Sequence, residues 1–229
     1  MDKNLRIIVE LLNQKSISYW IDSGTLLGLV REGDLIEKDN DIDISIWNKH
    51  EQDLIKLLPY MRHLGYTVIV SKYYGMTYRY KLISYRAAQS IEIDIAIFRE
   101  YQDYAWCPGG FPAYQPGTLT SLPQRFLEKL SRFQKFKLNA WKCSDAELSV
   151  TSWPWSYLYR VGTWWIPKDY FIHLVRLDKF NVTVPYDWKR YLDFRYGDWK
   201  KPVKSWRWYV DDSGFIGDRS PFDQILPNH

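Results

Sequence analysis

The sequence predicts a protein of the α/β (α+β) class, with a mixed β-sheet core flanked by helices and a helical, aromatic-rich cap at the C-terminal end. Two stretches, Asp41–Ile46 and Ile91–Ile97, alternate isoleucine with acidic or small residues, which is typical of half-buried strands. Helix-like and strand-like segments come in the order α-β-α-β-α-β-β-β, an order that favours a mixed sheet with helices packed on it. Beyond Cys107, proline, glycine and aromatic residues become frequent, which indicates a change of architecture.

The first three elements are predicted from apolar periodicity and turn residues. A helix is expected over residues 2–15, followed by a short strand over 18–21. A second helix is expected to begin around Thr25, with Ser23 or Thr25 as its cap. The apolar residues at helical spacing in the first helix are Leu5, Ile8, Val9 and Leu12.

The middle of the chain continues the alternation. We expect a strand over residues 41–47, a helix over 50–63 that ends before Gly65, and strands over 66–70 and 76–83. The residues expected on the inner face of that helix are Leu54, Ile55, Leu57 and Leu58.

The last strand of the expected core covers residues 91–98, and residues 101–106 extend it as a hairpin. Pro108-Gly109-Gly110 then marks a loop-rich stretch. Further helices are expected over residues 124–136, 169–179 and 187–196, the last of which is stopped by Gly197. We therefore expect a catalytic core over residues 1–105 and a cap over residues 106–229, packed as one globular unit.

Acidic residues share one face of the two isoleucine-rich strands. Asp41 and Asp43 point away from the isoleucines of the first strand, and Asp94 does so in the second. Because aspartate is disfavoured in strands, three such residues on neighbouring strands suggest a site for a divalent cation, Mg²⁺ or Mn²⁺. Glu92 shares this face, and a supporting or solvent-facing role is expected for it. The alternative is a solvated charged face on amphipathic strands.

A glycine turn between a strand and a helix precedes these residues. Ser23, Gly24 and Thr25 would expose backbone N–H groups at a helix N-terminus, where phosphate binds readily. Arg31 lies about two helical turns further on and could neutralise phosphate charge. A plain helix cap is the alternative reading of this turn.

Composition narrows the function classes. The chain has 229 residues and a net charge of +4, which gives no reason to expect a nucleic-acid partner. A basic run from Arg125 to Lys142 is expected to be a solvated helix face, with a surface for anionic lipid or acidic glycan as the alternative. The two cysteines, Cys107 and Cys143, lie in no metal or disulfide motif. Without a signal peptide or a long apolar run, the chain is expected in the cytoplasm, free of transmembrane segments, with a peripheral contact at the inner membrane face left open.

Several of these segments together resemble the signature of the LicD/fukutin family, within the nucleotidyltransferase-fold superfamily. The resemblance begins with Trp20-Ile21-Asp22-Ser23-Gly24-Thr25-Leu26-Leu27-Gly28 and continues through Arg31-Glu32-Gly33 to Asp39-Asn40-Asp41-Ile42-Asp43. The strand over residues 91–98 is similar to the strand that carries the family's third carboxylate. Near the C-terminal end, residues 184–202 resemble a further family box.

The resemblance implies a nucleotidyltransferase-like core and transfer of a phospho-alcohol from a CDP-activated donor, such as CDP-choline or CDP-ribitol, to a hydroxyl of a glycan. The acceptors it suggests are cell-surface glycans such as lipopolysaccharide, teichoic acid or capsule. Asp41, Asp43 and Asp94 would then be the catalytic metal ligands, and Ser23, Gly24, Thr25 and Arg31 would bind the donor. Two alternatives remain: a nucleotidyltransferase that releases pyrophosphate from an NTP, and a non-catalytic glycan-binding protein.

An aromatic stretch late in the chain is a candidate platform for the acceptor glycan or for choline, since aromatic faces bind sugars and quaternary ammonium groups. Packing in the cap is the alternative explanation for each of its residues. The stretch comprises Trp153, Trp155, Tyr157, Tyr159, Trp164 and Trp165.

Overall fold

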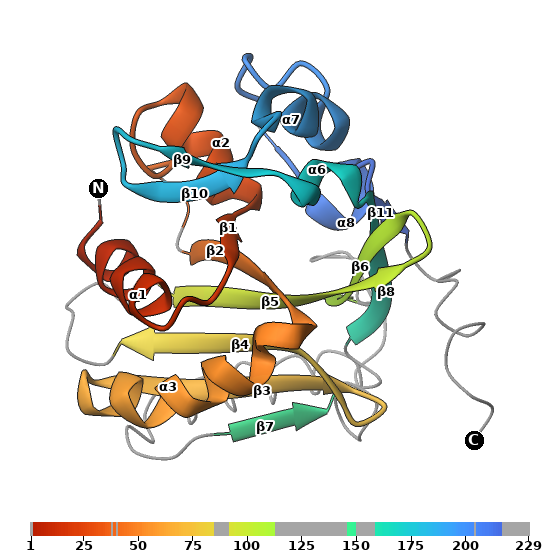
Figure 1. Ribbon diagram of the computed structural model, residues 1–229. Helices are drawn as coiled ribbons and strands as arrows, with labels where there is room; N and C mark the ends of the chain where they lie inside the picture. The colour runs from red at the N-terminus through yellow and green to blue at the C-terminus, as the bar shows by residue number, and fades with distance from the viewer. Residues whose placement is uncertain are drawn as a thin grey trace.

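The computed structural model describes residues 2–37, 39, 41–84, 92–112, 146–149, 159–203 and 205–216 (Figure 1). The N-terminal elements are α1 (Lys3–Gln14), β1 (Tyr19–Ile21), α2 (Ser23–Arg31), β2 (Asp41–Trp47), the 3₁₀ turn η1 (Asn48–His50), α3 (Glu51–His63), β3 (Tyr66–Tyr73), β4 (Met76–Ser84), β5 (Glu92–Tyr101) and β6 (Tyr104–Pro112). The later elements are β7 (Ala146–Ser149), β8 (Tyr159–Pro167), α6 (Asp169–Ile172), β9 (Leu174–Leu177), β10 (Val182–Pro185), α7 (Trp188–Tyr196), α8 (Trp208–Asp211) and β11 (Phe215–Ile216).

The described strands form a mixed sheet of nine strands and a separate pair, β9–β10. Its main path runs β11-β8-β6-β5-β4-β3-β7, and β2 joins it by pairing in parallel with β5 and antiparallel with β1. β5 is therefore central, since β2, β4 and β6 all pair with it. The α/β class and the mixed sheet predicted from the sequence are confirmed.

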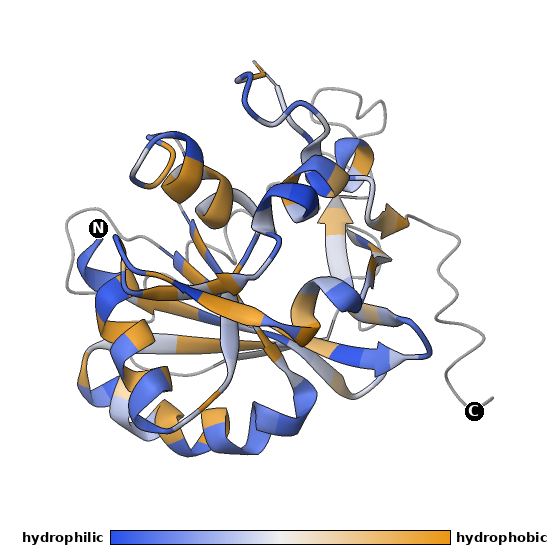
Figure 2. Cartoon of the chain, turned by 45° about the horizontal axis from the view of Figure 1, so that its top comes forward, coloured by the Kyte–Doolittle hydropathy of each residue, from blue (hydrophilic) through white to orange (hydrophobic). Residues whose placement is uncertain are grey.

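One face of the sheet carries the hydrophobic core. The isoleucines of β2 and β5 are fully buried there, as are the alternate residues Tyr78, Tyr80 and Leu82 of β4. Helices α1 and α3 lie against the sheet and turn their apolar residues toward it (Figures 1 and 2). Because residues on a strand alternate, this burial directs Asp41, Asp43 and Asp94 to the opposite face.

The predicted order of elements through residue 106 is confirmed, with two corrections of detail. The N-cap of α2 is Asp22, whose carboxylate accepts a hydrogen bond from the Ser23 N–H, and neither Ser23 nor Thr25 is the cap. Ile55 is 38% exposed, because the inward stripe of α3 follows Leu54, Leu57, Leu58 and Met61 at helical spacing.

The chain beyond Cys107 departs further from the prediction. Pro108-Gly109-Gly110 lies inside strand β6, not in a loop, and pairs with Thr163-Gly162-Val161 of β8. A side chain at Gly109 would collide with the Trp164 ring, so glycine is what allows this aromatic to pack on the strand. The helix expected over residues 169–179 is only the four-residue α6, because Leu174–Leu177 pairs with Val182–Pro185 as a hairpin.

Two other predictions about this half of the chain have different outcomes. The helix that Gly197 stops is confirmed as α7, where Gly197 adopts a φ of 62°. The helix over residues 124–136 and the basic run Arg125–Lys142 lie outside the described residues. The division into 1–105 and 106–229 stays a prediction, and strand pairing crosses it from β5 to β6 and β8.

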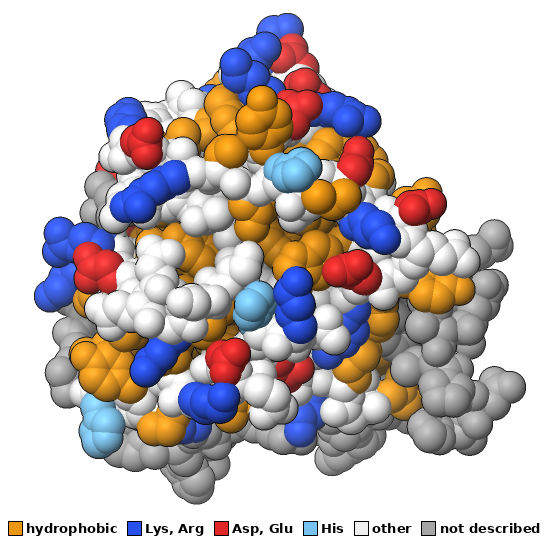
Figure 3. Space-filling model, viewed as in Figure 1, with side chains coloured by type: hydrophobic (Ala, Val, Ile, Leu, Met, Phe, Trp, Pro, Cys, Tyr) orange, Lys and Arg blue, Asp and Glu red, His pale blue; other side chains and the backbone are white. Residues whose placement is uncertain are grey.

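The surface of the described residues mixes charges of both signs. On the face seen in Figure 3, Lys and Arg side chains are interspersed with Asp and Glu, with hydrophobic patches between them. Among the described helices, none is long and apolar enough to span a membrane.

Candidate metal and phosphate site

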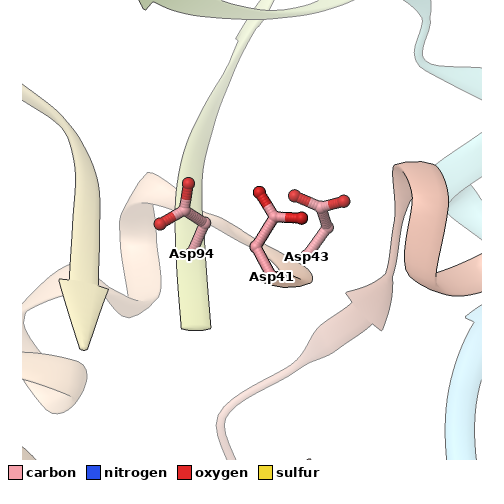
Figure 4. Close-up of side chains that lie close together, drawn as sticks. All are labelled: Asp41, Asp43 and Asp94. Atoms are coloured by element: carbon pink, nitrogen blue, oxygen red, sulfur yellow. The ribbon is translucent and has the colours of Figure 1, made fainter. Parts of the chain in front are cut away.

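Three carboxylates meet where β2 and β5 run side by side. Asp41 and Asp43 belong to β2, and Asp43 is directly opposite Asp94 of β5 in the parallel register. One oxygen from each of Asp41, Asp43 and Asp94 lies within 4.8 Å of the others. Figure 4 shows the three side chains rising from the two strands into the same space. The predicted convergence is therefore present.

The glycine turn is attached to this strand through its backbone. The N–H of Asp43 donates to the Thr25 hydroxyl oxygen at 2.8 Å, and the N–H of Asp22 donates to the Asp43 carbonyl at 3.1 Å. Thr25 is 1% exposed, and its contact with Asp43 holds β2 against α2. Ser23, which has a positive φ of 47°, and Gly24 line the cavity above the carboxylates. Backbone strain at a non-glycine residue is frequent at functional sites.

Glycines allow two close approaches around α2. A side chain at Gly24 would collide with the Asp39 carboxylate and would lie 3.8 Å from an oxygen of Asp43. A side chain at Gly28 would lie 2.8 Å from the Asp34 carbonyl oxygen and 2.9 Å from the Ile36 nitrogen. The segment that leads into β2 therefore folds tightly over the helix and brings Asp39 to the site.

The concentration of negative charge is reflected in the protonation of Asp43. Burial, followed by the carboxylates of Asp41, Asp94, Asp22 and Asp39, raises the pKa of Asp43 well above its usual range. Like charges at such distances are unfavourable unless a cation lies between them. The donor set consists of hard oxygen ligands, which fits a divalent cation of the Mg²⁺ or Mn²⁺ kind.

Two basic side chains from β4 reach Asp94. An Arg79 Nη1 lies 3.0 Å from Asp94 Oδ2, and Lys81 Nζ lies 3.2 Å from Asp94 Oδ1. Lys81 also pairs with Glu92, whose supporting or solvent-facing role stays a prediction. Sequence reasoning missed both cations, although Arg79 and Lys81 alternate on their strand just as the aspartates do.

A buried charge network lies beneath the glycine turn. Arg195 of α7 contacts Asp212 at 2.5 Å and Asp22 at 3.2 Å, and all three residues are at most 3% exposed. The Tyr191 hydroxyl donates to Asp22 at 2.5 Å, and an Arg195 N–H donates to the Ser23 hydroxyl at 3.3 Å. Burial lowers the pKa of Arg195, but the carboxylates outweigh it and raise this pKa overall. The network ties α7 to the turn, and no signal in the sequence pointed to Arg195.

These groups surround a cavity of about 610 Å³, a size that suits a small-molecule ligand. Gly24, Leu27 and Arg31 line it from α2, at the spacing of one helix face. Arg31 Nη1 donates to the Trp199 carbonyl at 3.2 Å, and Nη2 pairs with Glu32 at 2.7 Å. Cys107 also lines the cavity, and burial raises the pKa of its thiol to about 12, so it remains protonated at neutral pH.

Aromatic residues from the C-terminal part of the chain form one wall of the cavity. Trp164 is one of the residues proposed as a platform, and it lines the cavity together with Trp206 and Trp208. Trp164 stacks on Trp208 with ring centroids 5.0 Å apart, and its ring N–H donates to Asp212 at 3.2 Å. Trp165 instead stacks on Trp106. Trp153, Trp155, Tyr157 and the side chain of Tyr159 lie outside the described residues.

The fold and the site define a class: a mixed α/β protein whose sheet presents three converging carboxylates beside a glycine turn. The comparison with known families agrees. The family described as LicD/FKTN/FKRP, nucleotidyltransferase domain, matches residues 16–141, more than half of the 229 residues, and the chain belongs to this family. The matched region contains the glycine turn and all three aspartates.

Similar proteins occur in bacteria and in primates. The chain is 46% identical over 67 residues to an uncharacterized protein of Rickettsia prowazekii, covering 29% of this chain and 25% of that protein. It is 22% identical over 206 residues to the human ribitol-5-phosphate transferase FKTN, covering 89% of this chain and 34% of that protein. The chain thus spans between a quarter and about a third of the length of these relatives.

Proposed function

We propose that the protein transfers a phospho-alcohol, such as phosphocholine or ribitol phosphate, from a CDP-activated donor to a hydroxyl of a glycan. The observation that carries the proposal is the convergence of Asp41, Asp43 and Asp94 beside the Ser23-Gly24 turn, inside a ligand-sized cavity. Family membership and the similarity to a ribitol-5-phosphate transferase support the choice of reaction.

The acidic residues are proposed to hold Mg²⁺ or Mn²⁺ through one oxygen each. A divalent cation supplies, when bound, charge neutralisation for the diphosphate and for the leaving CMP. Gly24 would place its backbone N–H against a phosphate oxygen at the start of α2, and Ser23 would hold the turn beside it through its contacts with Asp22 and Arg195. Thr25 would fix this turn through its contact with Asp43, and Arg31 would add positive charge from the same helix face.

The proposed transfer is a substitution at phosphorus. The acceptor hydroxyl oxygen forms a bond to the phosphorus that carries the alcohol, and the bond from that phosphorus to the CMP oxygen breaks. The acceptor proton passes to a carboxylate, for which Asp94 is the candidate, and CMP leaves as the anion. Because the protein only has to position groups and stabilise charge, rigid strands are a suitable base for this site.

The aromatic wall is the proposed position of the acceptor. Trp164, Trp206 and Trp208 line the cavity, and stacked indole rings offer flat apolar faces to a sugar ring. The hydrogen bond from Trp164 to Asp212 fixes one of these rings relative to the glycine turn, because Asp212 also holds Arg195.

The test is calorimetric titration of CDP-choline, CDP-ribitol and CTP into the protein, each with and without Mn²⁺, followed by measurement of CMP release from any binder. We expect cation-dependent binding of one CDP-alcohol and release of CMP in the presence of a glycan acceptor. Binding of CTP alone, with pyrophosphate as product, would shift the function to nucleotidyl transfer. Cation-independent glycan binding without donor turnover would support a binding protein.

A further inference from the structure

Three neighbouring strands place their charged residues in rows across the sheet. Asp43 of β2, Asp94 of β5 and Lys81 of β4 face one another in one row, and Ser45, Ala96 and Arg79 make the next. Residues opposite each other on paired strands point to the same face of a sheet. Arg79 therefore shares the face of the three carboxylates.

The row that contains Arg79 is otherwise built from small side chains. Ala96 and Ser45 line the floor of the cavity next to Asp94, and Arg79 lines it from the far end of the row. A short side chain at Ala96 leaves room for the long side chain of Arg79 to lie over the floor toward the carboxylates. Its Nη1 reaches Asp94 at 3.0 Å.

The hydrogen-bonding capacity of Arg79 is only partly used. A guanidinium carries five N–H donors, and in the described part of the chain Asp94 is the partner that Arg79 contacts. The Nε of Arg79 is buried and makes no hydrogen bond to the described residues. A buried donor without a partner is costly, and a ligand with acceptor oxygens would satisfy it.

The other cations near the site each have a partner among the described residues: Arg195 pairs with Asp22 and Asp212, and Lys201 pairs with Asp198. Lys81 is shared between Asp94 and Glu92, and Arg31 is held by Glu32 and the Trp199 carbonyl. The Nε of Arg31 also makes no hydrogen bond to the described residues, so both arginines keep a donor for a ligand, and Arg79 is the one of the two that contacts Asp94.

We infer that Arg79 binds the diphosphate of the donor, in addition to its contact with Asp94. With an oxygen of Asp94 on a cation, the Arg79 guanidinium would turn its donors to non-bridging phosphate oxygens, which it could contact in pairs. This inference rests on the proposed function, because it assumes a donor that carries a diphosphate. Arg79 would share the charge-neutralising role that the sequence suggested for Arg31.

The test compares Arg79→Gln with Lys81→Gln. Both variants remove one cation from Asp94, but only Arg79 lines the cavity. Mn²⁺ affinity is measured by electron paramagnetic resonance, and the affinities for CDP and for inorganic pyrophosphate are measured by calorimetry at saturating Mn²⁺. Thermal unfolding verifies that both variants are folded.

We expect Lys81→Gln to change Mn²⁺ and CDP affinity together, by less than about threefold, through its effect on Asp94 and Glu92. Arg79→Gln should leave Mn²⁺ affinity within the same range but weaken CDP and pyrophosphate about 10- to 100-fold. Equal effects of the two substitutions on CDP would overturn the inference, since Arg79 would then act only on Asp94.

The outcomes also separate this inference from the proposed function. If the wild-type protein binds pyrophosphate but not CDP, and Arg79→Gln loses that binding, Arg79 is a phosphate ligand and the CDP donor is wrong. If both ligands bind but CMP is never released, the proposed transfer reaction is wrong. The binding data then decide by themselves whether Arg79 is a phosphate ligand. A wild-type protein that binds neither contradicts both.

Discussion

Two charged clusters of this protein lie beside the same glycine turn and differ in how their charges are balanced. In the first, Arg195 lies between Asp22 and Asp212, with contacts of 3.2 and 2.5 Å, and all three side chains are buried. In the second, Asp39, Asp41 and Asp43 gather near Asp94, and Asp94 is paired with the cations of β4.

The difference shows what each cluster is for. A buried charge that has its counter-charge inside the protein supports the fold, and removing one partner leaves the other uncompensated. In the second cluster, burial and the neighbouring carboxylates raise the pKa of Asp43, which fits the proposed cation site. The first cluster positions the turn, and the second is the proposed place of the chemistry.

Removing a carboxylate of the second cluster should have the largest effect on function. Asp41→Ala and Asp43→Ala are expected to lower CMP release by at least about 10³-fold, because each removes a cation ligand, while the protein remains folded. The measurement is CMP release with the donor that the wild type accepts. Asp53→Ala, which alters an exposed pair with Lys56 on α3, is the matched control and should keep its activity. An Asp43→Ala variant as active as the wild type would remove the acidic cluster from the mechanism.

Removing the cation of the first cluster should have the largest effect on stability. Arg195→Gln leaves Asp22 and Asp212 buried without a counter-charge, which typically costs about 3–5 kcal/mol of unfolding free energy. Arg190→Gln on the same helix breaks an exposed contact with Asp169 and should cost about 1 kcal/mol or less. Urea unfolding followed by circular dichroism measures both. Similar costs for the two variants would mean that the buried network does not hold the turn in place.

A methyl group at Gly28 tests how closely the segment before β2 must pack. Gly28→Ala would place a carbon 2.8 Å from the Asp34 carbonyl oxygen and force residues 34–36 to move. Such overpacking costs about 1–3 kcal/mol, and Mn²⁺ affinity should fall as well, because the moved segment leads to Asp39 and Asp41. Thermal unfolding and Mn²⁺ titration measure the two effects. Unchanged values for both would show that this segment adapts without disturbing the site.

The smallest expected effect is a dependence of stability on pH that a cation removes. The folded-state pKa of Asp43 is raised, so its stabilising contribution is complete below the unfolded-state pKa of about 3.9 and is lost as pH rises through the raised value. In chelator, the unfolding free energy of the wild type minus that of Asp43→Asn should therefore decrease with rising pH, by on the order of 1 kcal/mol for each pH unit that separates the folded-state pKa from the unfolded-state pKa. Added Mn²⁺ at pH 7 should stabilise the wild type and not the variant. A difference that increases with pH would have the wrong sign for this cluster.

Local patterns were sufficient to predict the region up to residue 106 and the carboxylates. Strict alternation placed Asp41, Asp43 and Asp94 on one face, and the isoleucines between them fixed which face is buried. Ile55 was misplaced because it is adjacent in sequence to the inward residues of α3 but lies off their helical stripe.

Contacts between distant segments account for what sequence reasoning missed. Arg195 and Asp22 are 173 residues apart, and Pro108-Gly109-Gly110 is a strand because β8 pairs with it and Trp164 packs on Gly109. Neither Arg195 nor β8 could be identified as a partner from local periodicity. Periodicity indicates which face of an element is buried, but it does not indicate which segment packs on that face. The alternation of Arg79 and Lys81 could be read from the sequence. Their contact with Asp94 could not be predicted, because it depends on β4 lying next to β5.

The most direct test of the central claim is a crystal of the protein grown or soaked with Mn²⁺, with anomalous diffraction recorded at the manganese absorption edge. We expect one strong anomalous peak among the carboxylates of Asp41, Asp43 and Asp94, lost in Asp43→Asn. A map without a peak there, from crystals in which Mn²⁺ binds elsewhere on the chain, would contradict it.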